Sequence, residues 1–218
     1  MSGIITVCLL YAFVYSFDYF RLWYHGNRYS YVSYGTFWQF FTAVLALVYL
    51  FHMELKQYFS VNFGSEVFFL LFAYFFGLIL SSLLYRHKER VCYQIGRAYK
   101  CLVPLYIAVK AKDLLFQQFS YLILAIFISR EIGFGFDAAL AYTLMLLVIN
   151  IPVVIGATKI WKQYILFGSV ILAIPFFYTY TKLGLFWPAM YLHAILYVFI
   201  WLTALDDEEI AKDVGKSV

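Results

Sequence analysis

Charged residues are scarce in this sequence. They make up 13% of its 218 positions, whereas a soluble domain usually carries about 25%. Apolar and aromatic residues make up 65% of the chain, and the mean hydropathy is +0.81. A water-soluble fold of this size does not have enough interior to bury so many apolar side chains. The composition excludes a disordered chain and an ordinary soluble enzyme, and it predicts an integral membrane protein.

Cysteine is also rare, and no large basic cluster is present. The three cysteines, Cys8, Cys92 and Cys101, do not follow the spacing of known metal or redox sites. We therefore expect no metal ion and no cofactor. The net charge of +4 is mainly a signal of topology in a membrane protein. We expect the lipid bilayer as a partner, and no nucleic acid.

Seven apolar stretches have close to the roughly 20 residues that a helix needs to cross a bilayer. Short connections make sequence neighbours antiparallel neighbours in space. The sequence therefore predicts an all-α, polytopic transmembrane bundle of about seven spans, which forms a single integral-membrane domain over residues 1–218. The predicted spans are Ile4–Trp23, Thr36–Met53, Val67–Tyr85, Lys112–Ser129, Ala138–Gly156, Tyr164–Tyr180 and Leu185–Leu205.

The distribution of positive charge predicts the orientation of these spans. With the N-terminus outside, 13 of the 16 Lys and Arg residues fall on the cytoplasmic side, and only Lys56, Arg130 and Lys182 fall outside. Cytoplasmic loops of membrane proteins carry such an excess of positive charge. The segment 206–218 then forms a cytoplasmic tail. We expect a multi-pass protein, with the bacterial inner membrane favoured over an endomembrane.

The segment Val91–Val109 has a different pattern. Its apolar residues recur at steps of three and four, and Gln94, Arg97 and Lys100 lie elsewhere on the helical wheel. This pattern predicts an amphipathic helix that lies in the membrane interface. The alternative is a short eighth span kinked at Pro104. An eighth span would reverse everything after it and spoil the charge distribution.

A few polar side chains fall inside the predicted spans, where each should face the bundle and bind a partner. Gln117 and Gln118 lie in the fourth span, one turn after Asp113, and Asn150 lies in the fifth. These two spans run in opposite directions. At ~1.5 Å per residue, Gln117 and Asn150 both lie about 8–9 Å from the cytoplasmic ends of their spans. The two amides are therefore expected at a similar level in the bundle.

The fifth span also contains Pro152, which has no N–H to donate to the carbonyl of Val148. We expect the side chain of Asn150 to help satisfy the backbone that this proline loosens.

His193 is the most deeply placed ionisable side chain in the predicted spans. It lies ~18 Å from the cytoplasmic end of the seventh span, and Tyr197 lies one turn closer to that end, on the same face. A histidine at this depth is a functional candidate. The alternative is a neutral imidazole hydrogen-bonded to Asn150, to a glutamine or to Tyr197. Both interpretations stay open.

The sequence Leu185-Phe-Trp-Pro-Ala-Met-Tyr-Leu-His-Ala resembles the last motif helix of the CPBP family. These are the CAAX-prenyl-protease-like, glutamate-type intramembrane proteases. Members often show a Leu-Trp-Pro-Ala-like entry followed by His-x-x-x-Asn. His193 takes the place of the histidine, and Tyr197 stands where the asparagine would be.

Two earlier motifs of the family fall on other residues of this chain. The Glu-Glu-x-x-x-Arg motif is nearest Gln117 and Gln118, with Leu122 in the place of the arginine. The Phe-x-x-x-His motif falls near Leu146–Asn150, with Asn150 in the place of the histidine. The resemblance covers residues 112–205 and implies a CPBP-like four-helix core there.

The departures from the family motifs bear on chemistry. A general base must accept a proton, and glutamine has the shape of glutamate but cannot do so. The resemblance therefore implies a divergent member without the usual protease activity. Such a protein would be a binding or assembly subunit of a membrane complex, with a transmembrane helix or a lipid-linked peptide in an intramembrane polar cleft.

Two other functions remain open from the sequence. One is an active membrane hydrolase with His193 as its catalytic residue. The other is a small transporter, or a subunit of a transport complex, in which the polar layer is the pathway. The binding-subunit and hydrolase hypotheses both expect the amides of Gln117, Gln118 and Asn150 to meet His193 in one cytoplasm-facing cavity.

Overall fold

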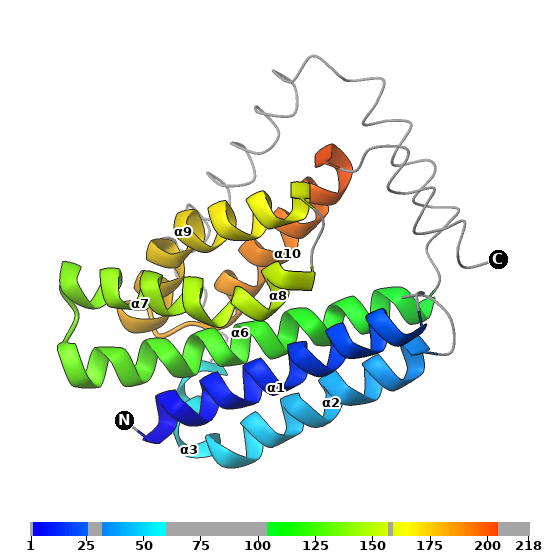
Figure 1. Cartoon of the computed structure of the whole chain (residues 1–218). Helices are drawn as coiled ribbons and strands as arrows, with labels where there is room; N and C mark the ends of the chain where they lie inside the picture. The colour runs from blue at the N-terminus through cyan, green and yellow to red at the C-terminus, as the bar shows by residue number, and fades with distance from the viewer. Residues whose placement is uncertain (1, 26–31, 60–103, 157–158, 205–218) are drawn as a thin grey trace.

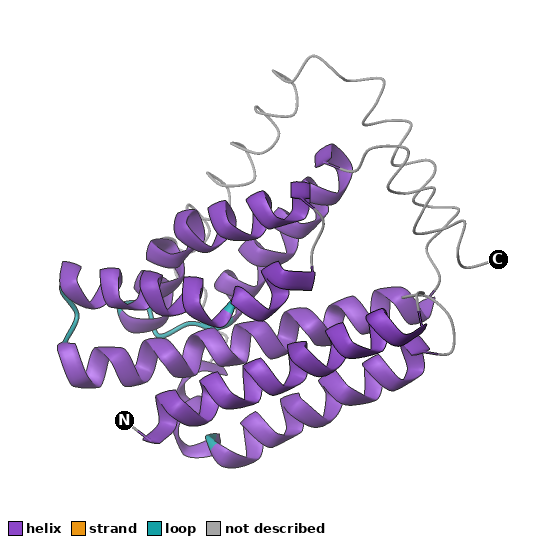
Figure 2. Cartoon of the chain, viewed as in Figure 1, coloured by secondary structure: helices purple, strands orange, loops and turns teal. Residues whose placement is uncertain are grey.

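A computed structural model describes residues 2–25, 32–59, 104–156 and 159–204, and this part of the chain is helical throughout apart from short turns (Figures 1 and 2). The prediction of an all-α fold is confirmed for these residues. The helices are α1 Ser2–His25, α2 Val32–Leu50, α3 His52–Leu55, the 3-10 helix η1 Lys56–Phe59, α6 Pro104–Ile132, α7 Phe136–Ile149, α8 Ile151–Gly156, α9 Lys159–Thr181 and α10 Trp187–Ala204.

Six of the seven predicted stretches overlap described helices. The remaining one, Val67–Tyr85, and the tail 206–218 lie outside the described residues. Within the part that is described, one helix is by itself long and apolar enough to cross a membrane, namely Lys110–Ile132 in α6. A second candidate forms if α2 and the α3–η1 segment are counted as one bent span, with an angle of 83° between its parts.

The start of α6 differs from the expected pattern. We expected an interfacial helix to end at Val109 and a new span to begin at Lys112, but one continuous helix runs from Pro104 to Ile132. The helix is continuous through residues 109–112, so the predicted boundary between Val109 and Lys112 is wrong. Residues 91–103 lie outside the described residues.

The fifth predicted span is broken in two at Asn150, between α7 and α8. Pro152 accounts for the break, because it cannot donate a hydrogen bond to the preceding turn. The Asn150 side chain does not bind the Val148 carbonyl, to which residue 152 has no N–H to donate. Its Nδ2 donates at 2.8 Å to the carbonyl of Leu146, which also accepts the backbone N–H of Asn150 at 3.2 Å.

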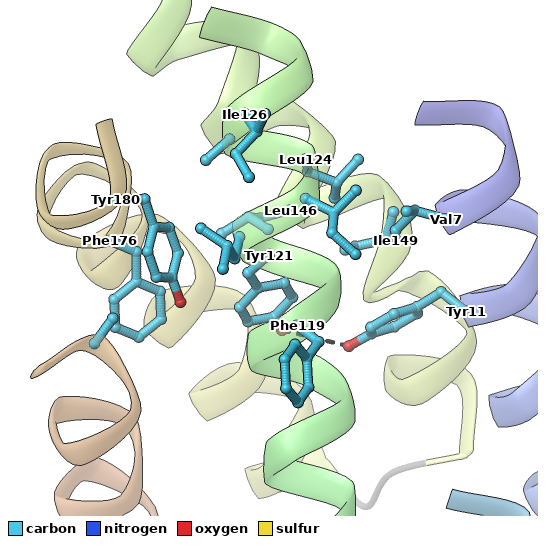
Figure 3. Packing of buried hydrophobic residues seen from close by; sticks show 14 of the residues in the cluster. Val7, Tyr11, Phe119, Tyr121, Leu124, Ile126, Leu146, Ile149, Phe176 and Tyr180 are labelled. Carbon is cyan, nitrogen blue, oxygen red and sulfur yellow. Dashed lines mark hydrogen bonds between the residues drawn. The ribbon is translucent and has the colours of Figure 1, made fainter. Parts of the chain in front are cut away.

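Helix α6 is the centre of the described fold. Helices α1 and α2 pack on one side of it, and α7, α9 and α10 pack on the other (Figure 1). Every residue from Phe116 to Ile126 is buried, and a helix that is covered all round must be a core helix. Figure 3 shows Tyr121 of α6 between Tyr11 of α1 and Phe176 of α9.

The described helices are apolar on their outer faces as well as in their core. Exposed apolar side chains recur about once per turn along the outer faces of the flanking helices: Ile5, Leu9 and Phe13 on α1, Leu140, Leu144 and Val148 on α7, and Val170, Ile174 and Tyr178 on α9. The core is mainly hydrophobic and also contains polar side chains, which include Asp113, Gln117, Gln118, Asn150, Ser169 and His193. A helix on the surface of a soluble protein usually carries polar residues on its outer face.

Candidate functional site

The imidazole of His193 lies in a buried polar cluster made by α6, α9 and α10, which we call the His193 cluster (Gln118, Tyr180 and His193). Gln118 Nε2 lies 2.6 Å from His193 Nδ1, and the Tyr180 hydroxyl donates to Gln118 Oε1. Because the tyrosine donates to Oε1, the amide nitrogen is the donor to Nδ1. This assignment of the network places the imidazole proton on Nε2.

Aromatic rings cover the faces of this imidazole. The Tyr121 ring is stacked on it, with 5.9 Å between ring centroids and 16° between planes. The Phe176 ring lies 5.7 Å from it at 48°. Among the described residues, no group of three or more His, Cys, Asp and Glu side chains is placed to hold a metal ion. The groups of this cluster around His193 are an amide, a phenol and aromatic rings.

The break between α7 and α8 lies in a second cluster, the Asn150 cluster (Tyr11, Tyr121, Asn150 and Ser169). The Tyr11 hydroxyl donates to Asn150 Oδ1 at 2.9 Å, and the Tyr121 hydroxyl lies 3.2 Å from the same atom. Asn150 Nδ2 donates to Ser169 Oγ at 3.0 Å, in addition to its bond with the Leu146 carbonyl. Every hydrogen-bonding position of the Asn150 amide is thereby used, and four helical segments are joined through it.

A third cluster connects α6 to α1 and is called the Asp113 cluster (Tyr15, Lys110, Asp113 and Gln117). The Tyr15 hydroxyl donates to Asp113 Oδ1, and Gln117 Nε2 donates to the same oxygen at 3.1 Å. Lys110 Nζ lies 3.5 Å from Asp113 Oδ2. A carboxylate that is buried in this way needs partners of this kind, and the structure supplies a cation, a phenol and an amide.

The structure distributes the expected site residues over three clusters along α6. It brings Gln118 and His193 into hydrogen-bond contact, and it separates Asn150 from them by the side chain of Tyr121. Gln117 binds Tyr15 and Asp113 instead, because adjacent residues of a helix point about 100° apart. The side chain of Tyr197 lies outside the described residues.

Four tyrosines belong to these clusters, although tyrosine in a membrane protein is expected first at the membrane interface. Tyr11 and Tyr15 lie four residues apart in α1 and face the amides of two different clusters. Tyr121 and Tyr180 bind Asn150 and Gln118. The sequence signal for three of them is a spacing of three or four residues: Tyr11 to Tyr15, and Tyr121 to the glutamine pair. Such spacing places them on a common helix face.

Comparison with known proteins gives no match for this chain among protein-family models, curated proteins or solved structures. The resemblance to the CPBP family therefore depends on the motifs quoted above.

Proposed function

We propose that the chain is a multi-pass integral membrane protein, a divergent CPBP-like protein that acts as a binding or assembly subunit and not as a protease. The observation that carries this proposal is the apolar outer surface of the described bundle, together with the polar side chains held in its core. Its outer helix faces are apolar, while its amides, its imidazole and a carboxylate are inside. In a bilayer, polar side chains must turn inward to find partners because lipid offers none.

The length of α6 fits this proposal. The 23 residues of Lys110–Ile132 extend ~34 Å, at ~1.5 Å per residue, and the hydrocarbon core is ~30 Å thick. Lys110 lies at one end of this segment, and Arg130 lies near the other. The neighbouring helices present their apolar faces outward along the same length, which favours lipid as their environment.

The packing of helix ends supports a topology in which successive helices cross the membrane in opposite directions. The start of α1 lies against the end of α6, since a Cβ atom at Gly3 would be 2.4 Å from the ring of Phe127. The end of α9 reaches the same end of the bundle, where Lys182 Nζ lies 5.0 Å from the centroid of the Phe134 ring. We propose that this end faces outward and that the tail 206–218 is cytoplasmic, in a bacterial inner membrane.

The contacts of the polar groups favour a binding role over hydrolysis. A general base needs an atom that can accept a proton from water. Gln118 stands in the place of the family glutamate, and its amide is bound to Tyr180 and His193. Asp113 is the buried carboxylate of the described part, and it is bound on the α1 side by Tyr15, Gln117 and Lys110. These groups hold helices together. The binding partner that we propose is a transmembrane helix or a lipid-linked peptide.

Topology reporters test the membrane part of the proposal. Alkaline phosphatase fused after Gly135 or after Gly184 should be active, because both glycines lie at the end assigned to the outer side. A green fluorescent protein fused after Val218 should fluoresce in the cytoplasm. The reverse pattern, or release of the whole protein from membranes by alkaline carbonate, would contradict it.

Hydrolysis assays test the functional part. The protein in phosphatidylcholine vesicles is mixed with a prenylated peptide and with a transmembrane peptide, and both cleavage and photo-crosslinking are followed. We expect crosslinking without cleavage. His193→Ala and Gln118→Ala are compared with Leu144→Ala, a change on the outer face of α7. Cleavage that is lost in His193→Ala and kept in Leu144→Ala would show an active hydrolase and overturn the proposal.

A further inference from the structure

The turn between α6 and α7 has the wrong composition for a connection that lies in water. Ile132, Phe134 and Phe136 are 53%, 56% and 76% exposed, and the two residues between them are Gly133 and Gly135. Connecting turns in water are dominated by polar residues and run over a solvated surface. This turn instead presents three large apolar side chains at the tip of a helical hairpin.

Two other segments meet the turn at this end of the bundle. Arg130 NH1 lies 3.9 Å from Glu54 Oε1 and joins α6 to α3, and Lys182, just after α9, lies above the Phe134 ring. The α3–η1 segment departs from α2 at 83°, so it runs across the end of the bundle and not along it. Met53 in this segment is 73% exposed. We call residues 52–59, 130–137 and 182–186 together the interfacial end.

The formal charges of the interfacial end are balanced. It contains three basic and three acidic side chains, Lys56, Arg130, Lys182, Glu54, Glu131 and Asp137. A surface without net positive charge gains nothing from an anionic lipid leaflet, which attracts polybasic segments. Side chains of both signs beside exposed aromatic rings are matched instead by headgroups that themselves carry both charges.

We propose that the interfacial end binds the headgroup and glycerol layer of zwitterionic phospholipids. Phe134 and Phe136 insert at the headgroup–acyl boundary, as the apolar side chains of interfacial segments do. Lys182 lies over the Phe134 ring and Arg130 over the Phe127 ring, and both long side chains place their charges among the phosphates. The inference rests on the proposed membrane function and adds the lipid class that this end contacts.

Spin labels at two depths test the proposal in the full-length protein. Gly135→Cys is the principal site, because its φ of −83° is ordinary and a Cβ atom there would meet no other atom within 4 Å. Asp137→Cys provides a second, independent label on the same turn. Leu144→Cys is the matched control on the outer face of α7, where the residue is 54% exposed. The native cysteines Cys8, Cys92 and Cys101 are replaced by serine in every variant.

The labelled proteins are reconstituted in phosphatidylcholine vesicles, and collision with oxygen and with a water-soluble nickel chelate is measured. Spin-labelled glutathione in the aqueous phase is the reference. We expect nickel collision at Gly135→Cys to be about three- to tenfold lower than for glutathione, and clearly higher than at Leu144→Cys, as for a side chain at the headgroup–acyl boundary. Replacing both Phe134 and Phe136 by Gln should return the Gly135 label to the glutathione value.

The outcomes separate this inference from the function on which it rests. A Gly135 label with the nickel accessibility of glutathione, beside a Leu144 label deep in acyl chains, overturns the interfacial end and leaves the membrane assignment standing. Both labels fully accessible to nickel would overturn the membrane assignment itself. A Gly135 label shielded from nickel and oxygen alike indicates a protein partner or a second copy and overturns the lipid assignment. A shift of more than about twofold when phosphatidylglycerol is added contradicts the charge balance.

Discussion

The Asn150 cluster and the His193 cluster are both buried sets of neutral polar groups, and they lie on either side of Tyr121. They differ in the groups that they join. Asn150 binds side chains of α1, α6 and α9 and also a backbone carbonyl of its own broken helix. The hydrogen bonds that link His193, Gln118 and Tyr180 join side chains to one another. A backbone carbonyl cannot be removed by evolution or mutation, whereas a side-chain partner can be replaced. The Asn150 cluster is therefore the more constrained by folding, and the His193 cluster is the freer to acquire a function.

The largest expected effect is that of Asn150→Leu. The change removes the hydrogen bonds of the Asn150 amide to Tyr11, Tyr121, Ser169 and the Leu146 carbonyl, and a hydrogen bond contributes a net ~0.5–1.5 kcal/mol to stability. We expect the free energy of unfolding to fall by about 2–4 kcal/mol, measured by detergent denaturation in micelles. Thr143→Val is the control, since the Thr143 hydroxyl donates to the Ala139 carbonyl of its own helix. Equal losses in the two variants would contradict the assigned role of Asn150.

Gln118→Leu should have a smaller effect, because only side chains lose a partner. We expect a loss of about 1–2 kcal/mol in the free energy of unfolding, as for one buried hydrogen-bonding side chain. Combined with Tyr180→Phe, the total should be less than the sum of the single losses, because both changes remove the same hydrogen bond. Additive losses would mean that Gln118 and Tyr180 do not interact.

Tyr180→Phe by itself tests the His193 cluster through the tautomer of His193. Without the Tyr180 hydroxyl, the Gln118 amide is free to turn and offer its oxygen to Nδ1. We expect nitrogen NMR of the labelled imidazole to show Nε2–H in the unsubstituted protein and a mixture of tautomers in the variant. The stability loss should be about 1 kcal/mol. A pure Nδ1–H form in the unsubstituted protein would be incompatible with the assigned network.

The smallest expected effect is that of Tyr142→Phe. The Tyr142 ring is fully buried against Phe177, and its hydroxyl has no hydrogen-bond partner among the described residues. Removing an unsatisfied buried hydroxyl should leave the free energy of unfolding unchanged or raise it by up to about 1 kcal/mol. Tyr180→Phe is the matched control, with the same atoms removed from a hydroxyl that has a partner. A clear loss of stability in Tyr142→Phe would reveal a partner for that hydroxyl.

Much of the helical arrangement follows from local sequence. Apolar length predicts α1, α6 and α9, and Pro152 predicts the disturbance at the end of α7. The boundary between Val109 and Lys112 was misplaced because charged residues such as Lys110 and Lys112 are compatible both with the end of a span and with the interior of a longer helix. Periodicity does not distinguish these two cases.

The candidate site is less predictable than the helices. Depth along the predicted spans paired Gln117 with Asn150 and placed His193 about 9 Å deeper, but the structure joins His193 to Gln118. Depth does not indicate rotation about the helix axis, and so it cannot tell that Gln117 faces α1 while Gln118 faces α9 and α10. The participation of the four tyrosines depends on the same unknown rotation.

The sequence by itself determined the all-α class, the apolar character of the chain and which polar residues must find partners, because these follow from composition and from local backbone rules. Only the tertiary structure decided the partners: Gln118 with His193 and Tyr180, Asn150 with Tyr11 and Ser169, and Asp113 with Tyr15. The reason is physical, since a polar group in an apolar surrounding requires some hydrogen bond but does not specify which. Packing of neighbouring helices around α6 makes that choice.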